Sequence, residues 1–179
     1  MKQNKQEAEV NAVAMLKKDH NKVAQLFEQL ERSAEADRRS IVTQIFNELE
    51  VHTTLEEEIF YPAVHDGVDM DSLLEEEDID ESDTDDEETI DDDDERDDMI
   101  AVSIEEHQEM RDFIKRLRDM DPACDAAKEG LAELKEAVQD HVAEEEELIF
   151  PAAELKLDLE SLGIQIEQRR NALVSSAAA

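Results

Sequence analysis

Apolar residues recur at alternating spacings of three and four along most of this chain, a pattern that predicts helices burying one face each. Five such stripes can be followed, and histidine or glutamate occupies inner positions in four of them. Their members are Val13, Leu16, His20, Val23, Phe27 and Leu30; Ile41, Ile45, Leu49, His52, Glu56 and Ile59; Ile100, Ile104, His107, Met110, Ile114 and Leu117; Leu131, Leu134, Val138, His141, Glu145 and Leu148; and Leu155, Leu159, Leu162, Ile166 and Leu173. The sequence therefore predicts an all-α fold.

Proline and turn residues indicate where the predicted helices end. Pro62 is expected to end the second helix, Asp121–Pro122 to separate the third from the fourth, and Pro151 to end the fourth. Four long amphipathic helices are typical of an antiparallel up-down-up-down four-helix bundle, with the fifth packed back as an additional C-terminal helix. We expect one domain over residues 1–179: helices one and two in 1–65, an insert in 66–98, helices three and four in 99–153, the C-terminal helix in 154–174 and a tail in 175–179.

Charge changes this picture in one segment. The chain has 52 acidic and 18 basic residues, a formal net charge of -34, which disfavours contact with nucleic acid and anionic membranes. Of the 33 residues from Asp66 to Asp98, 21 are acidic and one is basic. This long acidic insert between helices two and three has too few apolar residues to form a core, so we expect a solvated, mobile loop.

Three further observations predict a cytoplasmic protein. No apolar run approaches the roughly 20 residues of a membrane-spanning helix. Residues 1–10 lack the apolar core of a secretory signal. Cys124 is the single cysteine, so the chain forms no internal disulfide, which fits a reducing compartment.

The histidines carry the candidate chemistry. Four of the five occupy the predicted apolar faces of four different helices: His20, His52, His107 and His141. Glu56 and Glu145 follow the second and the fourth of these by four residues, which is one turn along the same face. The first two histidines stand 32 residues apart and the last two stand 34 apart, so the chain contains two similar helical hairpins.

Six polar groups brought into one bundle core require a partner. A buried carboxylate without one is strongly destabilising, and no basic residue lies beside the two glutamates on the predicted inner faces. Four imidazoles and two carboxylates suit first-row transition metals better than calcium or magnesium. The two-fold repetition favours two ions, each bound by two histidines, with both carboxylates and an oxo or hydroxo group as bridges. A structural zinc ion and a metal-free bundle are the weaker alternatives.

In order along the chain, His20, His52-x-x-x-Glu56, His107 and His141-x-x-x-Glu145 resemble the hemerythrin-like, or HHE, cation-binding domain family. The phrases Ile59 to Pro62 and Leu148 to Pro151 resemble the family as well. The resemblance implies a four-helix bundle, a class that includes myohemerythrin, around a non-haem di-iron centre. It implies two iron ions as cofactor, the four histidines as terminal ligands, and both glutamates as bridges.

Two features depart from the oxygen carriers of this family. Those proteins place a second histidine on helix three, four residues from the first, where this chain has Ser103 or Arg111. They also end the motif of helix four in aspartate, where this chain has Glu145. With one histidine fewer, redox chemistry, sensing and iron handling are as well supported as reversible oxygen carriage.

The resemblance and the candidate site together predict a protein that interacts with dioxygen or a related small oxidant, such as peroxide or nitric oxide, for binding, sensing or detoxification. An alternative is an iron-responsive interaction module, in which metal orders the bundle and a protein partner reads the acidic insert. A peroxidase-like enzyme is a third hypothesis, although the sequence assigns no catalytic residue to it. Neither nucleic acid nor membrane is an expected partner.

Residues beside the candidate ligands are given minor roles. Tyr61, five residues after Glu56, is expected to pack or to support the site. Asp19 and Glu106 each precede a candidate ligand histidine and are candidates to orient an imidazole of a neighbouring helix. His65 is expected in an exposed loop. Five other glutamates are expected to face solvent, the third of them near an entrance: Glu57, Glu58, Glu144, Glu146 and Glu147.

Overall fold

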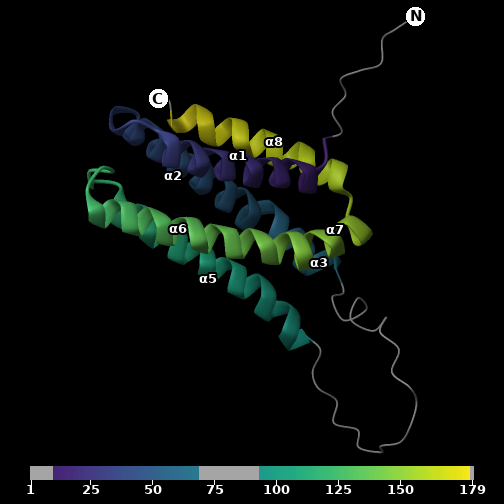
Figure 1. Ribbon diagram of the computed structural model, residues 1–179. Helices are drawn as coiled ribbons and strands as arrows, with labels where there is room; N and C mark the ends of the chain where they lie inside the picture. The colour runs from purple at the N-terminus through teal and green to yellow at the C-terminus, as the bar shows by residue number, and fades with distance from the viewer. Residues whose placement is uncertain (1–9, 69–92, 178–179) are drawn as a thin grey trace, which may run out of the picture.

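The computed structural model describes residues 10–68 and 93–177, and every regular element within these ranges is helical (Figure 1). In chain order the elements are α1 (Ala12–Arg32), α2 (Glu35–Leu55), the π-helical turn η1 (Glu56–Phe60), α3 (Tyr61–Gly67), α5 (Asp93–Leu117), α6 (Asp125–Glu144), the π-helical turn η2 (Glu145–Ile149), α7 (Phe150–Lys156) and α8 (Leu159–Ala177). The predicted all-α fold is confirmed. None of the described helices is both long enough and apolar enough to cross a membrane.

The ends of the expected segments shift. Residues 69–92, most of the expected acidic insert, lie outside the described residues. Of the described residues in the expected range of the insert, Asp66 and Gly67 belong to α3 and those from Asp93 onward belong to α5. The expected C-terminal tail is shorter, since α8 extends to Ala177.

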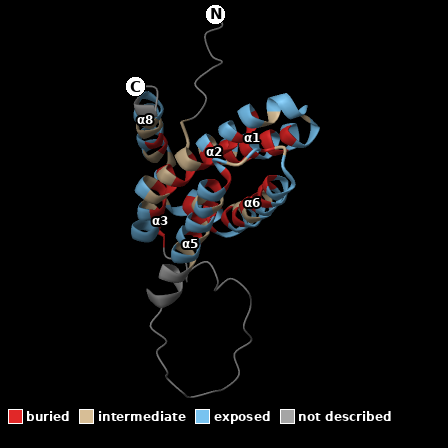
Figure 2. Cartoon of the chain, turned by 90° about the vertical axis from the view of Figure 1, so that its left-hand side faces the viewer, coloured by how far each residue is buried: buried red, intermediate tan, exposed pale blue. Residues whose placement is uncertain are grey.

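The bundle is built from two helical hairpins, α1 with α2 and α5 with α6, and α8 lies along the outside of α1 (Figure 1). Local signals set the helix starts. The side chain of Asn11 accepts a hydrogen bond of 2.9 Å from the backbone N–H of Ala14, which caps α1. Buried residues line the inner faces of the helices (Figure 2).

Two apolar clusters fill the bundle, and the polar residues of interest lie between them. One cluster takes residues 23–30 of α1 and 41–49 of α2, near the hairpin turns. The other takes residues 12–16 of α1, Leu55 and residues from α3, η2, α7 and α8. His20 and His52 stand along their helices between these two groups. The histidine layer is therefore closed above and below by close-packed apolar side chains.

The π-helical turns change which residues face inward. Each begins at a glutamate and holds one residue more than an α-helical turn, so the residues after it are rotated relative to a regular stripe. Leu148, expected on the inner face, is 51% exposed, whereas Ile149 is buried. In the other half Phe60 is fully buried and Ile59 only partly. The extra residue in each π-helical turn shifts the buried positions by one, so a regular helical period predicts the wrong residue as buried after each turn.

The expectation that Pro62 and Pro151 end their helices is wrong. Both lie in the first turn of a further helical segment, α3 and α7. Proline is tolerated in the first turn of a helix because its missing N–H costs little there. The helical path therefore continues past each proline, to Gly67 in α3 and to Lys156 in α7.

Two other expected core positions are exposed. Ile104 is 42% exposed, and Ser103 is buried in its place. Both lie within one turn before His107, and a period of 3.6 residues allows either to face inward. Leu155 is 69% exposed because it belongs to α7 rather than to the C-terminal helix.

The C-terminal helix α8 packs closely on the start of α1. Ile166 of α8 is fully buried. Gly163 allows the approach, because a Cβ atom there would lie 2.9 Å from the carbonyl carbon and oxygen of Val10 and 3.1 Å from the backbone nitrogen of Ala12. Backbone atoms cannot rotate away as a side chain does.

We therefore expect Gly163→Ala to destabilise the protein by about 1–3 kcal/mol through overpacking. Gly130→Ala is the matched control. Its Cβ would meet the terminal Cδ2 of Leu117 at 2.8 Å, which can move, and alanine favours the helix by about 1 kcal/mol. Urea unfolding followed by circular dichroism measures both. Equal losses for the two variants would contradict the close backbone contact at Gly163.

Candidate metal centre

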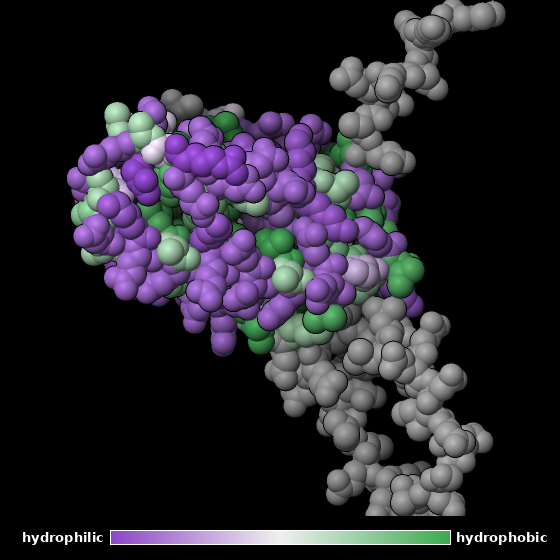
Figure 3. Space-filling view, viewed as in Figure 1, coloured by the Kyte–Doolittle hydropathy of each residue, from purple (hydrophilic) through white to green (hydrophobic). Residues whose placement is uncertain are grey.

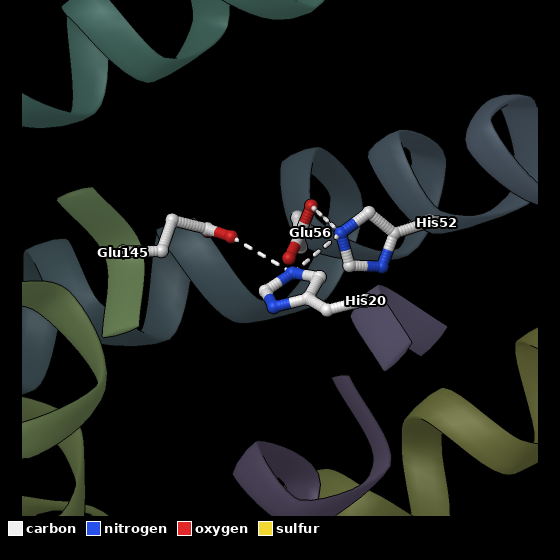
Figure 4. Close-up of side chains that lie close together, drawn as sticks. All are labelled: His20, His52, Glu56 and Glu145. Carbon is white, nitrogen blue, oxygen red and sulfur yellow. Dashed lines mark hydrogen bonds and ion pairs between the residues drawn. The ribbon is translucent and has the colours of Figure 1, made fainter. Parts of the chain in front are cut away.

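Six side chains meet in the layer between the two apolar clusters. They come from α1, from α2 and η1, from α5, and from α6 and η2. All are buried, and the two carboxylates and one imidazole are fully so: Glu56, Glu145 and His107 at 0%, His141 at 2%, His52 at 4% and His20 at 6% exposure. Figure 4 shows four of them converging from α1, α2 and the two π-helical turns. The structure thus brings together every residue that the sequence proposed as a metal ligand.

The imidazoles form two pairs, one within each hairpin. The Nε2 atoms of His20 and His52 lie 3.0 Å apart, and those of His107 and His141 also lie 3.0 Å apart. In both pairs the rings meet edge to face. Each pair therefore points two nitrogen lone pairs toward one small volume.

Each carboxylate reaches one imidazole of each pair. The Oε2 atom of Glu56 lies 3.1 Å from Nε2 of His52 and 3.5 Å from Nε2 of His107. The Oε2 atom of Glu145 lies 3.4 Å from Nε2 of His141 and 3.2 Å from Nε2 of His20. The two glutamates thus link the hairpins across the bundle in a nearly two-fold arrangement.

The charges of this cluster are not balanced by the protein. Burial and the nearby charge of Glu145 raise the pKa of Glu56 well above its usual range. In the described parts of the chain, neither glutamate forms an ion pair with lysine or arginine. Both oxygens of Glu56 and Oε2 of Glu145 are buried without a hydrogen bond. Buried oxygens of this kind are expected to have a partner.

A metal ion would supply that partner. Two groups of side chains could each hold one, and they share a glutamate: His20, His52, Glu56 and Glu145 in the first, and Glu56, His107 and His141 in the second. Burial and the neighbouring His141 lower the pKa of His107 to about 2, so its imidazole is neutral, the form that binds metals. Imidazole and carboxylate donors suit first-row transition metals. The residues present therefore fit a metal centre.

A second layer of carboxylates contacts the outer nitrogen of each imidazole. Three Nδ1 atoms are within hydrogen-bond distance of a carboxylate: His20 with Glu146 at 2.9 Å, His107 with Glu57 at 3.0 Å and His141 with Glu106 at 2.8 Å. Nδ1 of His52 lies 3.7 Å from Asp19, beyond hydrogen-bond distance. Such contacts orient an imidazole and fix its tautomer in metal sites. Asp19 and Glu106 accordingly contact a neighbouring helix, as the sequence suggested.

Glu57 and Glu146, expected to face solvent, are only partly exposed, at 25% and 37% of their side chains, and each contacts an imidazole. Each is the second residue of a π-helical turn and follows the glutamate that enters the core. The wide turn lets two consecutive side chains reach imidazoles on neighbouring helices. A regular helical period predicts only one of them inside, so the sequence analysis missed this pair.

Two arginines neutralise part of this outer layer. Arg170 of α8 forms two hydrogen bonds with Asp19, of 3.2 Å from Nη1 and 2.5 Å from Nη2. The neighbouring His52 and Arg170 lower the pKa of Asp19 against the opposing effect of its burial. Arg111 donates to Glu57 at 2.5 Å and to Thr53 Oγ1 at 3.4 Å. The C-terminal helix is thereby linked to the histidine layer.

Aromatic rings differ between the two halves of the site. The ring of Tyr61 stacks on His107 and that of Phe150 stacks on His20, both with centroids 5.5 Å apart. The Tyr61 hydroxyl donates a hydrogen bond of 2.9 Å to Oε1 of Glu145. Burial, with both glutamates nearby, raises the pKa of Tyr61. Phe150 lacks a hydroxyl, so the two halves are chemically unequal.

His65 has no part in this cluster. It lies in the helix α3 rather than in a loop, is largely exposed, and contacts Asp66 Oδ1 at 3.0 Å. It is absent from both groups that could hold a metal among the described residues.

Comparisons with known proteins agree with this geometry. The family described as the hemerythrin HHE cation binding domain matches residues 11–100, 75–153 and 98–170. The fold is similar, with a TM-score of 0.68, to the crystal structure of a hemerythrin HHE cation binding domain-containing protein from Mycobacterium kansasii. That match is 22% identical and covers 94% of this chain and 90% of the other.

A curated relative is considerably longer. A protein named DNA nickase from Nostoc sp. is 26% identical over 159 residues, which are 88% of this chain and 38% of that protein. The chain therefore spans well under half the length of this relative.

The link from α8 to the histidine layer gives a prediction about stability. Arg170→Met leaves Asp19, which is 8% exposed, without its cation. We expect a loss of about 1–3 kcal/mol in the free energy of unfolding of the metal-free protein.

Arg169→Met is the matched control. This neighbouring arginine forms an exposed pair with Glu58 across the same interface, and exposed pairs contribute little. Chemical unfolding of both variants compares them directly. A loss from Arg169→Met as large as that from Arg170→Met would argue against a special role for Asp19.

Proposed function

The chain belongs to the hemerythrin HHE cation-binding domain family, and on this basis we propose that its buried cluster holds two iron ions and interacts with a small oxidant such as dioxygen, peroxide or nitric oxide. The four histidines His20, His52, His107 and His141 would be the terminal ligands. Glu56 and Glu145 would bridge the two ions. A pair of iron ions supplies reversible electron exchange with a small oxidant.

One observation supports the bridging role above all. Each of the two glutamates approaches an imidazole from both histidine pairs, at 3.1–3.5 Å for the four contacts between Oε2 and Nε2. A carboxylate that serves a single ion would approach one pair only. Both oxygens of Glu56 are buried without a hydrogen bond, which is consistent with the same role.

The surrounding side chains prepare the site. The outer carboxylates hold the imidazoles with Nε2 turned inward, so ligand orientation is fixed before an ion arrives. The rings of Tyr61, Phe60 and Phe150 close one end of the layer and exclude water. The Tyr61 hydroxyl holds one oxygen of Glu145 in place.

Whether the centre binds or turns over an oxidant is a separate question within this proposal. A peroxidase-like activity would need a proton donor near the centre, and Tyr61 is the hydroxyl closest to Glu145 among the described interactions. Comparing peroxide consumption by the iron-loaded protein with that by a ligand variant such as His107→Ala separates an enzyme from a binding protein, and Tyr61→Phe then tests the proton donor.

We propose no nucleic-acid substrate for this chain. A net charge of -34 repels a phosphate backbone. The matched segment is 38% of the relative named DNA nickase, so the activity in that name is not carried over to this chain.

A second candidate function is an iron-responsive module whose folding depends on metal. The buried oxygens of Glu56, which form no hydrogen bond, favour it, because the metal-free protein then carries unsatisfied hydrogen-bond acceptors in its core. The free energy of metal binding would then add to the free energy of folding, and metal binding would change the surface that the bundle offers to a partner.

The bridging role predicts opposite effects of one substitution on metal content and on metal-free stability. We expect Glu56→Gln to lose at least one of two ions per chain, because a neutral amide is a poor bridging ligand. Its metal-free form should be more stable than the metal-free parent, because a buried carboxylate crowded by Glu145 is removed. Elemental analysis and urea unfolding measure the two effects.

Glu144→Gln is the matched control for this experiment. It changes the exposed glutamate directly before Glu145 and should alter neither quantity. Retention of two ions by Glu56→Gln would refute the bridging assignment.

Metal loading should also raise the melting temperature. A ligand that binds only the folded state stabilises it by about 2.7 kcal/mol at a free concentration of 100 times its dissociation constant. Calorimetry of chelator-treated and iron-loaded protein, with helicity followed by circular dichroism, tests this. Equal melting temperatures would contradict both the metal centre and the metal-dependent module.

A further inference from the structure

A cleft of about 630 Å³ lies between α1 and α6 and reaches one of the candidate ligands, His20. Its wall is mainly apolar and is formed by Ala24, Phe27, Val138, Val142 and Ala143. Hydrophobic surface shows between these two helices in Figure 3, which has the same view as Figure 1. The cleft therefore joins solvent to the edge of the buried histidine layer.

The charged residues of the cleft favour cations. Glu28, Glu146 and Glu147 lie along it, against Lys135. Lys135 also pairs with Glu31 at 2.5 Å, so part of its charge is already neutralised. Glu146 links the cleft to the site, because it lines the cleft and contacts Nδ1 of His20 at 2.9 Å. Glu144, expected near an entrance, is not among the lining residues.

The other half of the duplicated fold closes the equivalent position. Ala24 follows His20 by four residues, and Arg111 follows His107 by four residues. The Arg111 side chain extends to Glu57 and Thr53, and Glu57 contacts Nδ1 of His107. On the other side the short side chain of Ala24 leaves open space beside Glu146. The solvent exposure of the two histidines agrees with this difference, since His107 is fully buried and His20 is 6% exposed.

We propose that the cleft between α1 and α6 is the entrance through which divalent metal ions reach the buried cluster, and that Arg111 closes the corresponding path on the opposite side. This inference rests on the proposed function, because it presumes that the cluster binds metal. Carboxylates along a narrow cleft raise the local concentration of cations. An incoming ion therefore meets Glu147 and Glu28 before Glu146 and the imidazole of His20.

The first experiment fills the entrance. Ala24→Leu fills the space without adding charge. Ala24→Arg places an arginine at the position equivalent to Arg111, where its guanidinium would pair with Glu146. Ala36→Arg is the matched control, since it makes the same change at an exposed position of α2 that does not line the cleft. Metal-free full-length protein is mixed with cobalt(II), and visible absorption reports uptake. Transfer to excess chelator reports release.

We expect both Ala24 variants to take up and release cobalt(II) about tenfold more slowly than the parent. For uptake this is the lower end of the range by which clefts lined with one sign of charge change association rates. The ratio of the two rates should stay constant. An entrance alters both rates by one factor and leaves the equilibrium affinity unchanged, whereas a ligand changes the affinity. Ala36→Arg should match the parent in both rates.

The second experiment opens the closed side. Arg111→Ala removes the side chain over Glu57 and His107, so the double variant with Ala24→Arg should recover much of the parent rate of uptake. Failure to recover would overturn the role given to Arg111.

The outcomes separate this inference from the proposed function. Parent protein that binds cobalt(II), together with unchanged rates in both Ala24 variants, would overturn the entrance while leaving the metal centre intact. A changed affinity with an unchanged uptake rate would do the same. Parent protein that binds no metal at equilibrium would overturn both proposals.

Discussion

Two carboxylates buried beside one another are the constraint on which the rest of this structure depends. Glu56 and Glu145 have no exposed surface, and their partners are imidazoles and a tyrosine hydroxyl. A folded core tolerates such a pair only if protons or cations neutralise it. The apolar clusters on either side, and the carboxylates behind each imidazole, hold these groups in place against their mutual repulsion.

The π-helical turns are the local device that makes the arrangement possible. Each turn starts at the inner glutamate and lets the following residue, Glu57 or Glu146, reach an imidazole on another helix. One short segment thereby supplies a carboxylate to the inner cluster and a second carboxylate that orients one of the imidazoles. The same turn carries Tyr61 or Phe150 back over a histidine, so the site is closed by the element that builds it. Such irregular turns are frequent at functional sites.

The duplicated halves differ in the side chains that surround the inner cluster. Tyr61 stands where the other half has Phe150, and Arg111 stands where it has Ala24. The outer carboxylate Asp19 is held by Arg170 of α8, an element attached to one side of the bundle. The inner cluster is nearly two-fold, whereas its surroundings are not. This asymmetry gives the centre one closed side, one side open to a cleft, and one anchored to the C-terminal helix.

The sequence by itself determined the helical class, the two hairpins and all six residues of the inner cluster, because a period of 3.6 residues assigns each histidine and each glutamate four residues later to an inner face. It also suggested Asp19 and Glu106 as neighbours of the site. It failed at Leu148, where a regular period was extended through a π-helical turn, and at Ile104, where two positions fit the period equally well. It failed at Pro62 because that proline lies in the first turn of a further helix and does not end the helical path. Only the tertiary structure decided that Glu57 and Glu146 face imidazoles, that Arg170 anchors α8, and that Ala24 borders a cleft. These are contacts between side chains on different helices, and their geometry depends on how far apart the packed helices stand, which no pattern along a single helix contains.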